Sequence, residues 1–195
     1  MKNSSGGTEQ RSPSQKDERG TGGKERLTPL DIHQLVGEDG RIPRSTTADA
    51  EIVKQESERI QQGSWLFIAH ENEIPNPGDY KALSLAQQPV IVVRDDDGRV
   101  RVLFNICRHR AVTVCREGKG NTRYFQCAYH GWMYNTKGNL VGVNGAEPYG
   151  QRFRKETKGL VPLPRVEMYR GFIFASLSAT GETLSEYLGK VKFGI

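Results

Sequence analysis

The feature that most restricts the fold of this sequence is a concentration of cysteine and histidine in one short stretch, CRHRAVTVCREGKGNTRYFQCAYH. Cys107 and His109 are two residues apart, Cys127 and His130 are three apart, and residues 110–126 separate the two pairs. The 195-residue chain has three cysteines and four histidines, so half or more of each type lies here. Thiolates and imidazoles are common metal ligands, and four of them require two loops that close on one site.

The segments around this stretch favour β structure. Short runs rich in β-branched and aromatic residues alternate with turn sequences such as NPGD, DDDG and NTKG, which is typical of antiparallel strands. We therefore expect a mainly β fold, a small antiparallel β-sandwich or barrel, and not alternating strand–helix units. The predicted strands include residues 64–70, 79–85, 89–94 and 101–106, a hairpin over GWMY and NLVGV, and two strands in PRVEMYRGFIFASL.

Two segments outside the strands predict helices. Residues 49–62 are helical in character, and Asp49 can cap the amide groups of the first turn. Their apolar face is thin, because only Ile52, Val53 and Ile60 could be buried. The stretch TLSEYLGKV, with its first threonine as N-cap, predicts a second, short helix. The N-terminal segment of about 26 residues is rich in serine, glycine and charge, and predicts a disordered tail.

Composition and charge exclude several classes of protein. No run of residues is apolar enough to cross a bilayer and the N-terminus lacks a secretory signal, so we expect a cytoplasmic protein without a membrane partner. An odd number of cysteines fits a reducing compartment better than a disulfide framework. The net charge of +5 is modest, and the sequence has no continuous basic stripe with aromatic residues, so we expect no nucleic-acid partner.

Three interpretations of the Cys–His stretch remain open on the residues alone. Each pair follows a predicted strand, so two facing loops can gather both sulfurs on one side and both nitrogens on the other. That is the ligand set of a Rieske [2Fe–2S] centre, in which two histidines replace two cysteines on one iron. A zinc finger normally pairs cysteine with cysteine, so the mixed pairs here disfavour zinc. Four ordinary buried residues at neighbouring strand ends form the third interpretation.

The full pattern resembles a known family. Cys-x-His, 17 residues and Cys-x-x-His, with GSWLFIAHENEIPNPGDY before them and YHGWMYNTKGNLVGV after them, is similar to the Rieske domain in the large (α) subunit of ring-hydroxylating oxygenases. The similarity runs from about Leu30 to the last residue. It implies that Cys107 and Cys127 hold one iron and that His109 and His130 hold the other. The residues that the resemblance places around the cluster are Arg108, Arg110, Tyr129, Gly131 and Trp132.

The resemblance also implies a domain organisation. Residues 1–28 would form the tail, 29–63 an N-terminal segment with the first helix, and 64–158 the Rieske [2Fe–2S] domain. Residues 159–195 would begin a truncated α+β catalytic domain, so their strands would be orphaned elements. In that case GFIFASL would expose an unsatisfied apolar face.

The implied function is electron transfer within an oxidoreductase. By resemblance, the chain is part of an aromatic ring-hydroxylating dioxygenase α subunit, used in aromatic hydrocarbon catabolism, and passes electrons from ferredoxin to a mononuclear Fe(II). In the family two histidines and a carboxylate hold that iron in the catalytic domain, whereas only His33 and His70 are left here. We therefore expect no catalytic residue and no activity of this fragment alone. The alternative is a stand-alone Rieske-type ferredoxin that carries electrons.

The partners that the family implies are ferredoxin, ferredoxin reductase and a trimer of α subunits, with or without a small β subunit. Basic residues in the Cys–His stretch would steer an acidic ferredoxin toward the cluster. They fit a solvated charged face with no partner equally well. The residues concerned are Arg108, Arg110, Arg116, Lys119 and Arg123, against the single acid Glu117.

Departures from related proteins set further expectations. High-potential Rieske proteins join their two loops by a disulfide, but this chain has Val112 and Tyr129 at the positions concerned. They also place a serine against the cluster where this chain has Trp132, and fewer hydrogen bonds to sulfur favour a low reduction potential. The family's usual glycine after His-Arg is Ala111 here, and a positive φ there would cost roughly 1 kcal/mol. Cys115 is expected to be a buried structural thiol.

Overall fold

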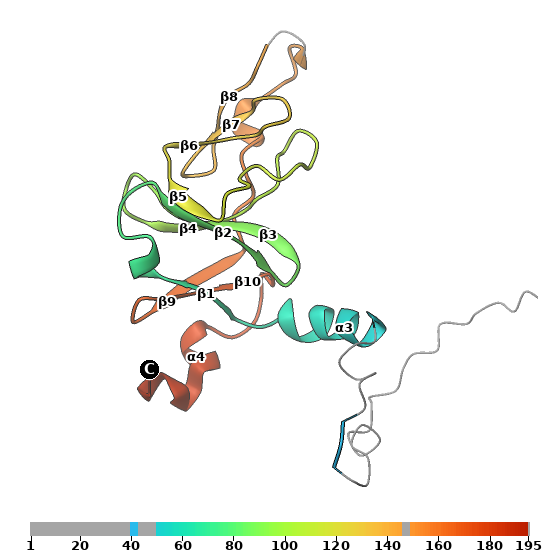
Figure 1. Cartoon of the computed structure of the whole chain (residues 1–195), viewed down its shortest axis with the longest axis vertical. Helices are drawn as coiled ribbons and strands as arrows, with labels where there is room; N and C mark the ends of the chain where they lie inside the picture. The colour runs from blue at the N-terminus through green and yellow to red at the C-terminus, as the bar shows by residue number, and fades with distance from the viewer. Residues whose placement is uncertain (1–39, 43–49, 146–148, 195) are drawn as a thin grey trace, which may run out of the picture. The chain divides into compact units, whose positions relative to one another are not determined.

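The computed structural model describes residues 40–42, 50–145 and 149–194 (Figure 1). The predicted tail, residues 1–28, and the predicted N-cap Asp49 lie outside the described residues.

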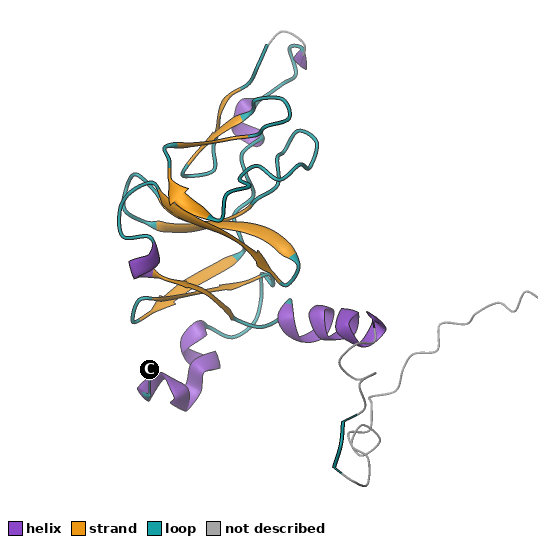
Figure 2. Ribbon diagram, viewed as in Figure 1, coloured by secondary structure: helices purple, strands orange, loops and turns teal. Residues whose placement is uncertain are grey.

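The chain divides into two units, Met1–Thr46 and Thr47–Ile195, and every element named below belongs to the second. This unit is mainly β, as the sequence predicts, and its helices are short (Figure 2). Helix α3 spans Ala50–Glu56, and the π-helical turn η1 extends it over Ser57–Gln61, close to the predicted end at residue 62. No residue of α3 is buried, in agreement with the thin apolar face of its sequence.

The predicted strands are present, with ends that differ from the prediction by one or two residues in most cases. Short 3-10 turns lie between some of them, η2 (Glu71–Glu73) and η4 (Lys155–Thr157), and a third, η5 (Gly189–Phe193), comes after the last strand. The strands are β1 (Leu66–His70), β2 (Asp79–Leu85), β3 (Gln88–Arg94), β4 (Val100–Phe104), β5 (Lys119–Asn121), β6 (Tyr124–Gln126), β7 (Met133–Asn135), β8 (Leu140–Gly142), β9 (Arg165–Tyr169) and β10 (Phe172–Ser176).

These strands form three sheets in which every pair of neighbours is antiparallel. We call them the terminal sheet (β1-β10-β9), the central sheet (β4-β3-β2-β5) and the site sheet (β6-β7-β8). Figure 1 shows the central sheet between the other two, and one apolar core lies on each of its faces. The two Cys–His pairs belong to the core on the side of the site sheet.

Strand β3 contributes to both cores. Val90, Ile91, Val92 and Val93 are all fully buried, because β3 pairs with a strand on each edge and is covered on each face. Successive side chains of a strand point to opposite faces, so Val90 and Val92 face one core while Ile91 and Val93 face the other. The first core includes Ile68, Val102, Ile173 and Ala175, and the second includes Leu103, Cys107, Cys127 and Trp132.

Strand β10, which carries most of GFIFASL, is the middle strand of the terminal sheet. Phe174 is only 9% exposed, because it packs with Trp65 and with Leu184 and Leu188 of helix α4 (Leu184–Leu188). The expectation of an unsatisfied apolar face on this strand is therefore wrong, since the chain covers the strand with its own helix. The pairing of β10 with β1 also joins segments on either side of residue 159, so β9 and β10 are not orphaned, while the domain boundary itself stays a prediction.

Helix α4 begins where the sequence predicts. The Thr183 hydroxyl accepts a hydrogen bond from the Glu186 backbone N–H at 3.3 Å, and the Glu186 carboxylate accepts one from the Thr183 N–H at 2.8 Å. This reciprocal capping box satisfies two amide groups that a helix start leaves without partners. The capping box stabilises the start of the helix, while Leu184 and Leu188 pack it against the terminal sheet.

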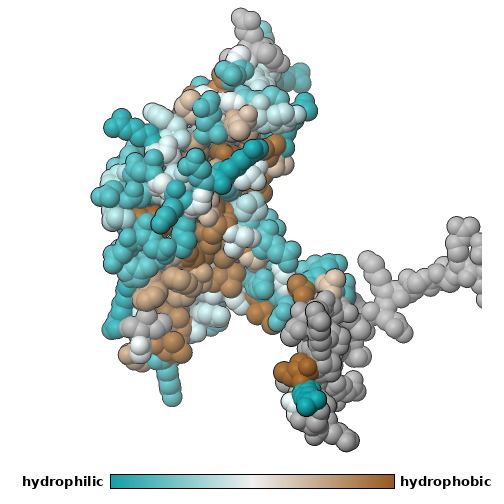
Figure 3. Space-filling view, viewed as in Figure 1, coloured by the Kyte–Doolittle hydropathy of each residue, from teal (hydrophilic) through white to brown (hydrophobic). Residues whose placement is uncertain are grey.

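Exposed apolar side chains remain beside this helix. Figure 3 shows brown, apolar atoms gathered in the lower part of the view, where Figure 1 places the terminal sheet and α4. The large apolar residues of these elements that are more than a third exposed are Phe67, Met168 and Tyr187. Among the described residues, no helix is long and apolar enough to cross a membrane.

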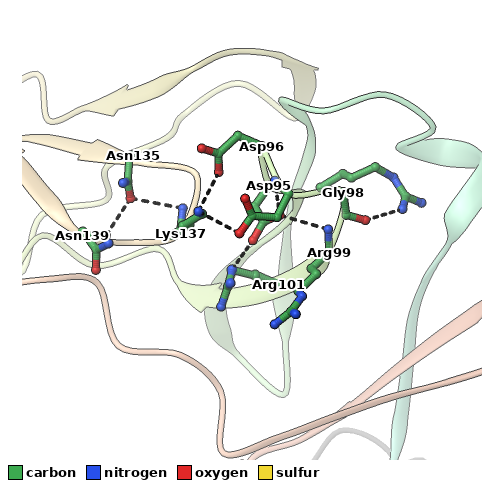
Figure 4. Close-up of polar contacts among 10 residues, drawn as sticks. Asp95, Asp96, Gly98, Arg99, Arg101, Asn135, Lys137 and Asn139 are labelled. Atoms are coloured by element: carbon green, nitrogen blue, oxygen red, sulfur yellow. Dashed lines mark hydrogen bonds and ion pairs between the residues drawn. The ribbon is translucent and has the colours of Figure 1, made fainter.

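A buried carboxylate holds the DDDG turn between β3 and β4 (Figure 4). Asp95 is fully buried and accepts hydrogen bonds from the Asp97 and Arg99 backbone N–H groups, each at 2.9 Å, and from the Arg101 guanidinium. Burial raises the pKa of Asp95, but the bonds from Arg101 and from the two N–H groups outweigh burial and leave the pKa below its usual value.

Replacing Asp95 with Asn should lower the free energy of unfolding at pH 7 by about 2 kcal/mol, because charged acceptors make the stronger hydrogen bonds. The folded pKa of Asp95 lies below its unfolded value, so its stabilisation is present above the unfolded pKa and is lost as pH falls through the folded pKa. The Asp95→Asn protein should therefore lose less stability than the parent between pH 6 and about pH 3. Urea unfolding followed by circular dichroism measures both effects.

The matched control is Asp96→Asn, in the same turn, because the Asp96 side chain is 71% exposed and an exposed ion pair contributes little. It should change stability by less than about 0.5 kcal/mol. Equal losses in the two variants would contradict the role assigned to Asp95.

Candidate functional site

The first half of the site is a loop that follows β4. In this first loop, residues 107–111, the Ala111 N–H donates to the Cys107 carbonyl at 3.0 Å. The Cys107 N–H donates to the Val112 carbonyl at 2.8 Å. These two bonds close the loop on itself, so its backbone is fixed at both ends.

The second half repeats this arrangement between β6 and β7. In the second loop, residues 127–131, the Gly131 N–H donates to the Cys127 carbonyl at 2.9 Å. The Cys127 N–H donates to the Trp132 carbonyl at 2.8 Å. Each loop therefore begins with a cysteine and closes by the same two backbone bonds, although histidine lies two residues after the first cysteine and three after the second.

The last residue of each loop has a left-handed backbone. Gly131 has φ +69°, a conformation that glycine adopts at no steric cost. Ala111 occupies the equivalent place with φ +54°, so the condition raised by the family's glycine is met, and the Cβ of Ala111 costs roughly 1 kcal/mol there. A Cβ on Gly131 would also lie 3.0 Å from Asn144 Nδ2, which makes glycine the better fit in the second loop.

A buried asparagine anchors the segment that follows the first loop. The Asn105 side chain is almost fully buried and accepts hydrogen bonds from the Val114 and Cys115 N–H groups at 3.1 and 2.8 Å. Its amide also donates to the Cys115 carbonyl at 2.7 Å. Sequence analysis missed this residue, because nothing in the local pattern around Asn105 indicates partners ten residues later.

The four candidate ligands lie within these two loops. Cys107 and Cys127 are 3% and 2% exposed, and both belong to the core beneath the loops. The rings of His109 and His130 lie side by side, with centroids 4.6 Å apart and planes at 69°. Sulfur donors thus lie inside, in the core, while the two imidazoles share the half-buried edge of the site.

One nitrogen of this site is prepared for a ligand. Among the described residues, His109 Nδ1 is the buried side-chain nitrogen or oxygen that has no hydrogen-bond partner. Desolvation, with smaller effects from His130 and Arg110, lowers the pKa of His109, which favours the neutral imidazole. A neutral imidazole with a free nitrogen is the form that coordinates a metal.

The donor atoms do not form a mononuclear site. A tetrahedral zinc ion needs donor atoms within about 4 Å of one another, because its bonds are only about 2.0–2.3 Å long. In the described part of the chain, no three of the Cys–His donor atoms lie within 4.8 Å of one another. A pair of sulfurs and a pair of nitrogens on two separate metal ions fit such a spread better than one zinc ion does.

Three carboxylates elsewhere do lie that close, but cations of the chain already compensate them. Asp95, Asp96 and Asp97 have donor atoms within 4.8 Å of one another. The Lys137 ammonium lies 3.4 Å from the Asp96 carboxylate and 2.8 Å from that of Asp97, and Arg101 pairs with Asp95 (Figure 4). This group is a charge network that connects the central sheet with the turn between β7 and β8.

A buried tyrosine of β7 contacts the first loop from the side of the core. Tyr134 is fully buried, its Oη lies 3.2 Å from Cys107 Sγ, and it accepts a hydrogen bond from the Arg108 N–H at 3.0 Å. Burial, followed by the contact with Cys107, raises the pKa of Tyr134, so the hydroxyl keeps its proton. Because the Arg108 N–H supplies one hydrogen to the oxygen, the hydroxyl hydrogen is free to point at the sulfur.

The remaining sequence-predicted residues surround the imidazoles. The Trp132 ring is buried and stacks on His109, with centroids 4.9 Å apart and planes at 9°. Tyr129 is 56% exposed and contacts His130 with centroids 3.8 Å apart. Arg108 and Arg110 are exposed beside them.

The other cysteine and the other described histidine lie elsewhere. Cys115 is half-buried, not buried as expected, and burial raises the pKa of its thiol. His70 Nδ1 accepts a hydrogen bond from the Asn72 N–H at 3.2 Å, so this ring caps the turn η2 and contacts Phe172. His33 lies outside the described residues.

Comparisons with known proteins find a matching family and several relatives. Residues 64–164 match the family described as Rieske [2Fe-2S] domain. The α subunit of N,N-dimethyl phenylurea N-demethylase from Sphingobium sp. (strain YBL2) is 44% identical over 157 residues, which are 80% of this chain and 34% of that protein. The α subunit of biphenyl 2,3-dioxygenase from Rhodococcus jostii (strain RHA1) is 44% identical over 174 residues, which are 88% of this chain and 37% of that protein.

A solved structure shows the same fold. Naphthalene 1,2-dioxygenase from Rhodococcus sp., bound to indole, superposes with a TM-score of 0.75 and 41% identity, over 84% of this chain and 37% of the other. The chain spans about a third of the length of the curated relatives that it matches.

Proposed function

This chain belongs to the Rieske [2Fe–2S] domain family, and from that premise we propose that Cys107, Cys127, His109 and His130 hold its cluster. The observation that carries this proposal is the unpartnered, buried Nδ1 of His109 beside the ring of His130, above two buried thiols. A bound [2Fe–2S] cluster supplies one-electron transfer. In this assignment the cysteines bind the inner iron and the histidines the outer one.

The protein residues have separate tasks in this function. The backbone bonds of the two loops orient the cysteines, and the core beneath them excludes water from both sulfurs. The stacked ring of Trp132 supports His109 on one side. The Tyr134 hydroxyl lies 3.2 Å from Cys107 Sγ, and because a metal-bound cysteine is a thiolate that can only accept, Tyr134 would donate the hydrogen bond to it.

We propose further that the chain acts within an aromatic ring-hydroxylating oxygenase. There it would take electrons from ferredoxin and pass them to a mononuclear iron held elsewhere in the enzyme. Similarity to oxygenase α subunits extends over 174 residues, well beyond the 64–164 match, and this supports the proposal over a stand-alone Rieske-type ferredoxin. A trimer of α subunits, with or without a small β subunit, and a cytoplasmic location belong to the same proposal.

Loss of single ligands tests the site assignment. Replacing Cys107 or Cys127 with Ala should abolish the bound iron. The inner iron would lose one of its two protein ligands, and the outer iron would lose the inner iron as its neighbour in the cluster. The third cysteine provides a matched control, since Cys115→Ala should keep the iron and the colour. Iron analysis, the visible spectrum and electron paramagnetic resonance (EPR) of the dithionite-reduced protein are the measurements. A colourless parent protein that contains stoichiometric zinc would overturn the proposal.

Replacing Tyr134 with Phe should lower the reduction potential. A hydrogen bond to a ligand sulfur stabilises the electron-rich reduced state, and about 1 kcal/mol of it corresponds to about 40 mV for one electron. Trp132 in place of a serine predicted few hydrogen bonds to the cluster sulfurs and hence a low reduction potential. The contact of Tyr134 with Cys107 adds one such bond, so the reduction potential should be higher than that prediction implies. A redox titration followed by EPR measures the shift, and Tyr124→Phe, at an exposed tyrosine of β6, is the control. An unchanged potential in Tyr134→Phe would contradict the hydrogen bond.

Exposed basic residues in the Cys–His stretch support ferredoxin as the electron donor. The five basic side chains of residues 108–123 are all exposed in the structure, and so is the one acid among them, Glu117. Such a surface raises the rate of encounter with an acidic protein, and salt screens the effect.

Replacing Arg110 and Arg116 with Glu should therefore slow reduction by an acidic ferredoxin at low salt and have little effect at high salt. Stopped-flow reduction at several ionic strengths measures the rate. The control is Lys190→Glu, which carries the same type of charge change in η5, on the side of the terminal sheet. Unchanged rates at low salt would remove this partner surface from the proposal.

A further inference from the structure

The connection between β8 and β9 contacts the site through aromatic side chains. The Trp132 indole N–H donates a hydrogen bond to the Tyr149 hydroxyl at 2.9 Å. The Tyr149 ring also meets His109 edge-on, with centroids 5.7 Å apart and planes at 80°. Sequence analysis assigned this connection no role, but the structure places its tyrosine against His109 and Trp132.

A second aromatic ring fixes this tyrosine. Phe153 stacks on Tyr149 with centroids 4.8 Å apart and planes at 28°, and it meets Trp132 edge-on at 5.6 Å. Both Tyr149 and Phe153 are partly buried against the core that contains the two cysteines. Trp132, Tyr149 and Phe153 therefore form one packed group, which we call the aromatic brace.

In the described part of the chain, the ring contacts of the aromatic brace with the candidate ligands are with His109 and not with His130. The indole of Trp132 is parallel to the His109 imidazole at 4.9 Å, and Trp132 is only 2% exposed, so its plane restricts the rotation of that imidazole. The Tyr149 hydroxyl is the polar contact of the indole N–H, and this bond sets the direction in which the indole plane lies. His130 has the exposed Tyr129 beside it instead, which leaves its surroundings more open.

We propose that Tyr149 is a positioning residue that sets the orientation of the ligand imidazole of His109 through Trp132. This inference rests on the proposed role of His109 as a ligand of the cluster. Neighbours that orient a metal-bound imidazole tune the metal as well as hold the ring. Tyr149 thereby makes a segment outside both loops part of the electronic environment of the outer iron.

The test is Tyr149→Phe in the full chain with its cluster. The variant keeps the ring that packs against Phe153 and His109, and removes only the acceptor of the indole N–H. We expect unchanged iron content, together with a shift of the EPR g values and of the histidine nitrogen couplings in pulsed EPR, larger than the scatter between parent preparations. The matched control is Tyr169→Phe, which also removes a hydroxyl hydrogen bond, to the Lys192 carbonyl at 2.8 Å, on the terminal sheet. Its spectrum should equal that of the parent.

A second comparison separates positioning from general loosening. The Trp132→Phe protein has no indole N–H, so adding Tyr149→Phe to it should cause no further change in the spectrum or in iron content. If Tyr149→Phe has the same effect in both backgrounds, or no effect in the parent, the inference is overturned. A parent protein with no Rieske-type EPR signal would instead overturn the proposed function.

Discussion

The structure depends on a strand that is buried on both faces. Val90 and Val92 of β3 fill the core toward the terminal sheet, while Ile91 and Val93 fill the core that carries the two cysteines. The site is therefore built on the same strand that holds the two cores together. Because side chains alternate along a strand, a shift of one residue in the register of β3 would exchange the two faces and disturb both cores at once.

Backbone hydrogen bonds determine the shape of the two loops of the site. Two loops of unlike sequence adopt one scheme of hydrogen bonds, and each ends at a residue with positive φ. Side chains then differentiate the two loops. The first has Tyr134 against its cysteine and Trp132 against its histidine. The histidine of the second loop contacts the ring of His109 and that of the exposed Tyr129. The two loops thus have similar backbone structures but different side-chain surroundings.

Local sequence predicted the features that depend on near neighbours. The strands and the Thr183 N-cap follow from residue type and short spacing, and the structure confirms them. The question of a positive φ at Ala111 came instead from the family's usual glycine at that place. Contacts between distant segments were out of reach. Tyr134 lies 27 residues from Cys107, and β10 pairs with β1 more than 100 residues away. Nothing in a local pattern states which partner such a residue meets, and this is why the covered face of β10 and the contact of Tyr149 with Trp132 were missed.

The hydrogen-bond scheme of the loops also has an evolutionary consequence. Because backbone groups close each loop, the outward side chains of Arg108, Arg110 and Tyr129 are not needed to hold its shape. Selection can therefore replace these side chains, one by one, without displacing the cysteines beneath them. Under the proposed function, a lineage could acquire a new electron donor by altering these outward side chains while the proposed ligands stay the same.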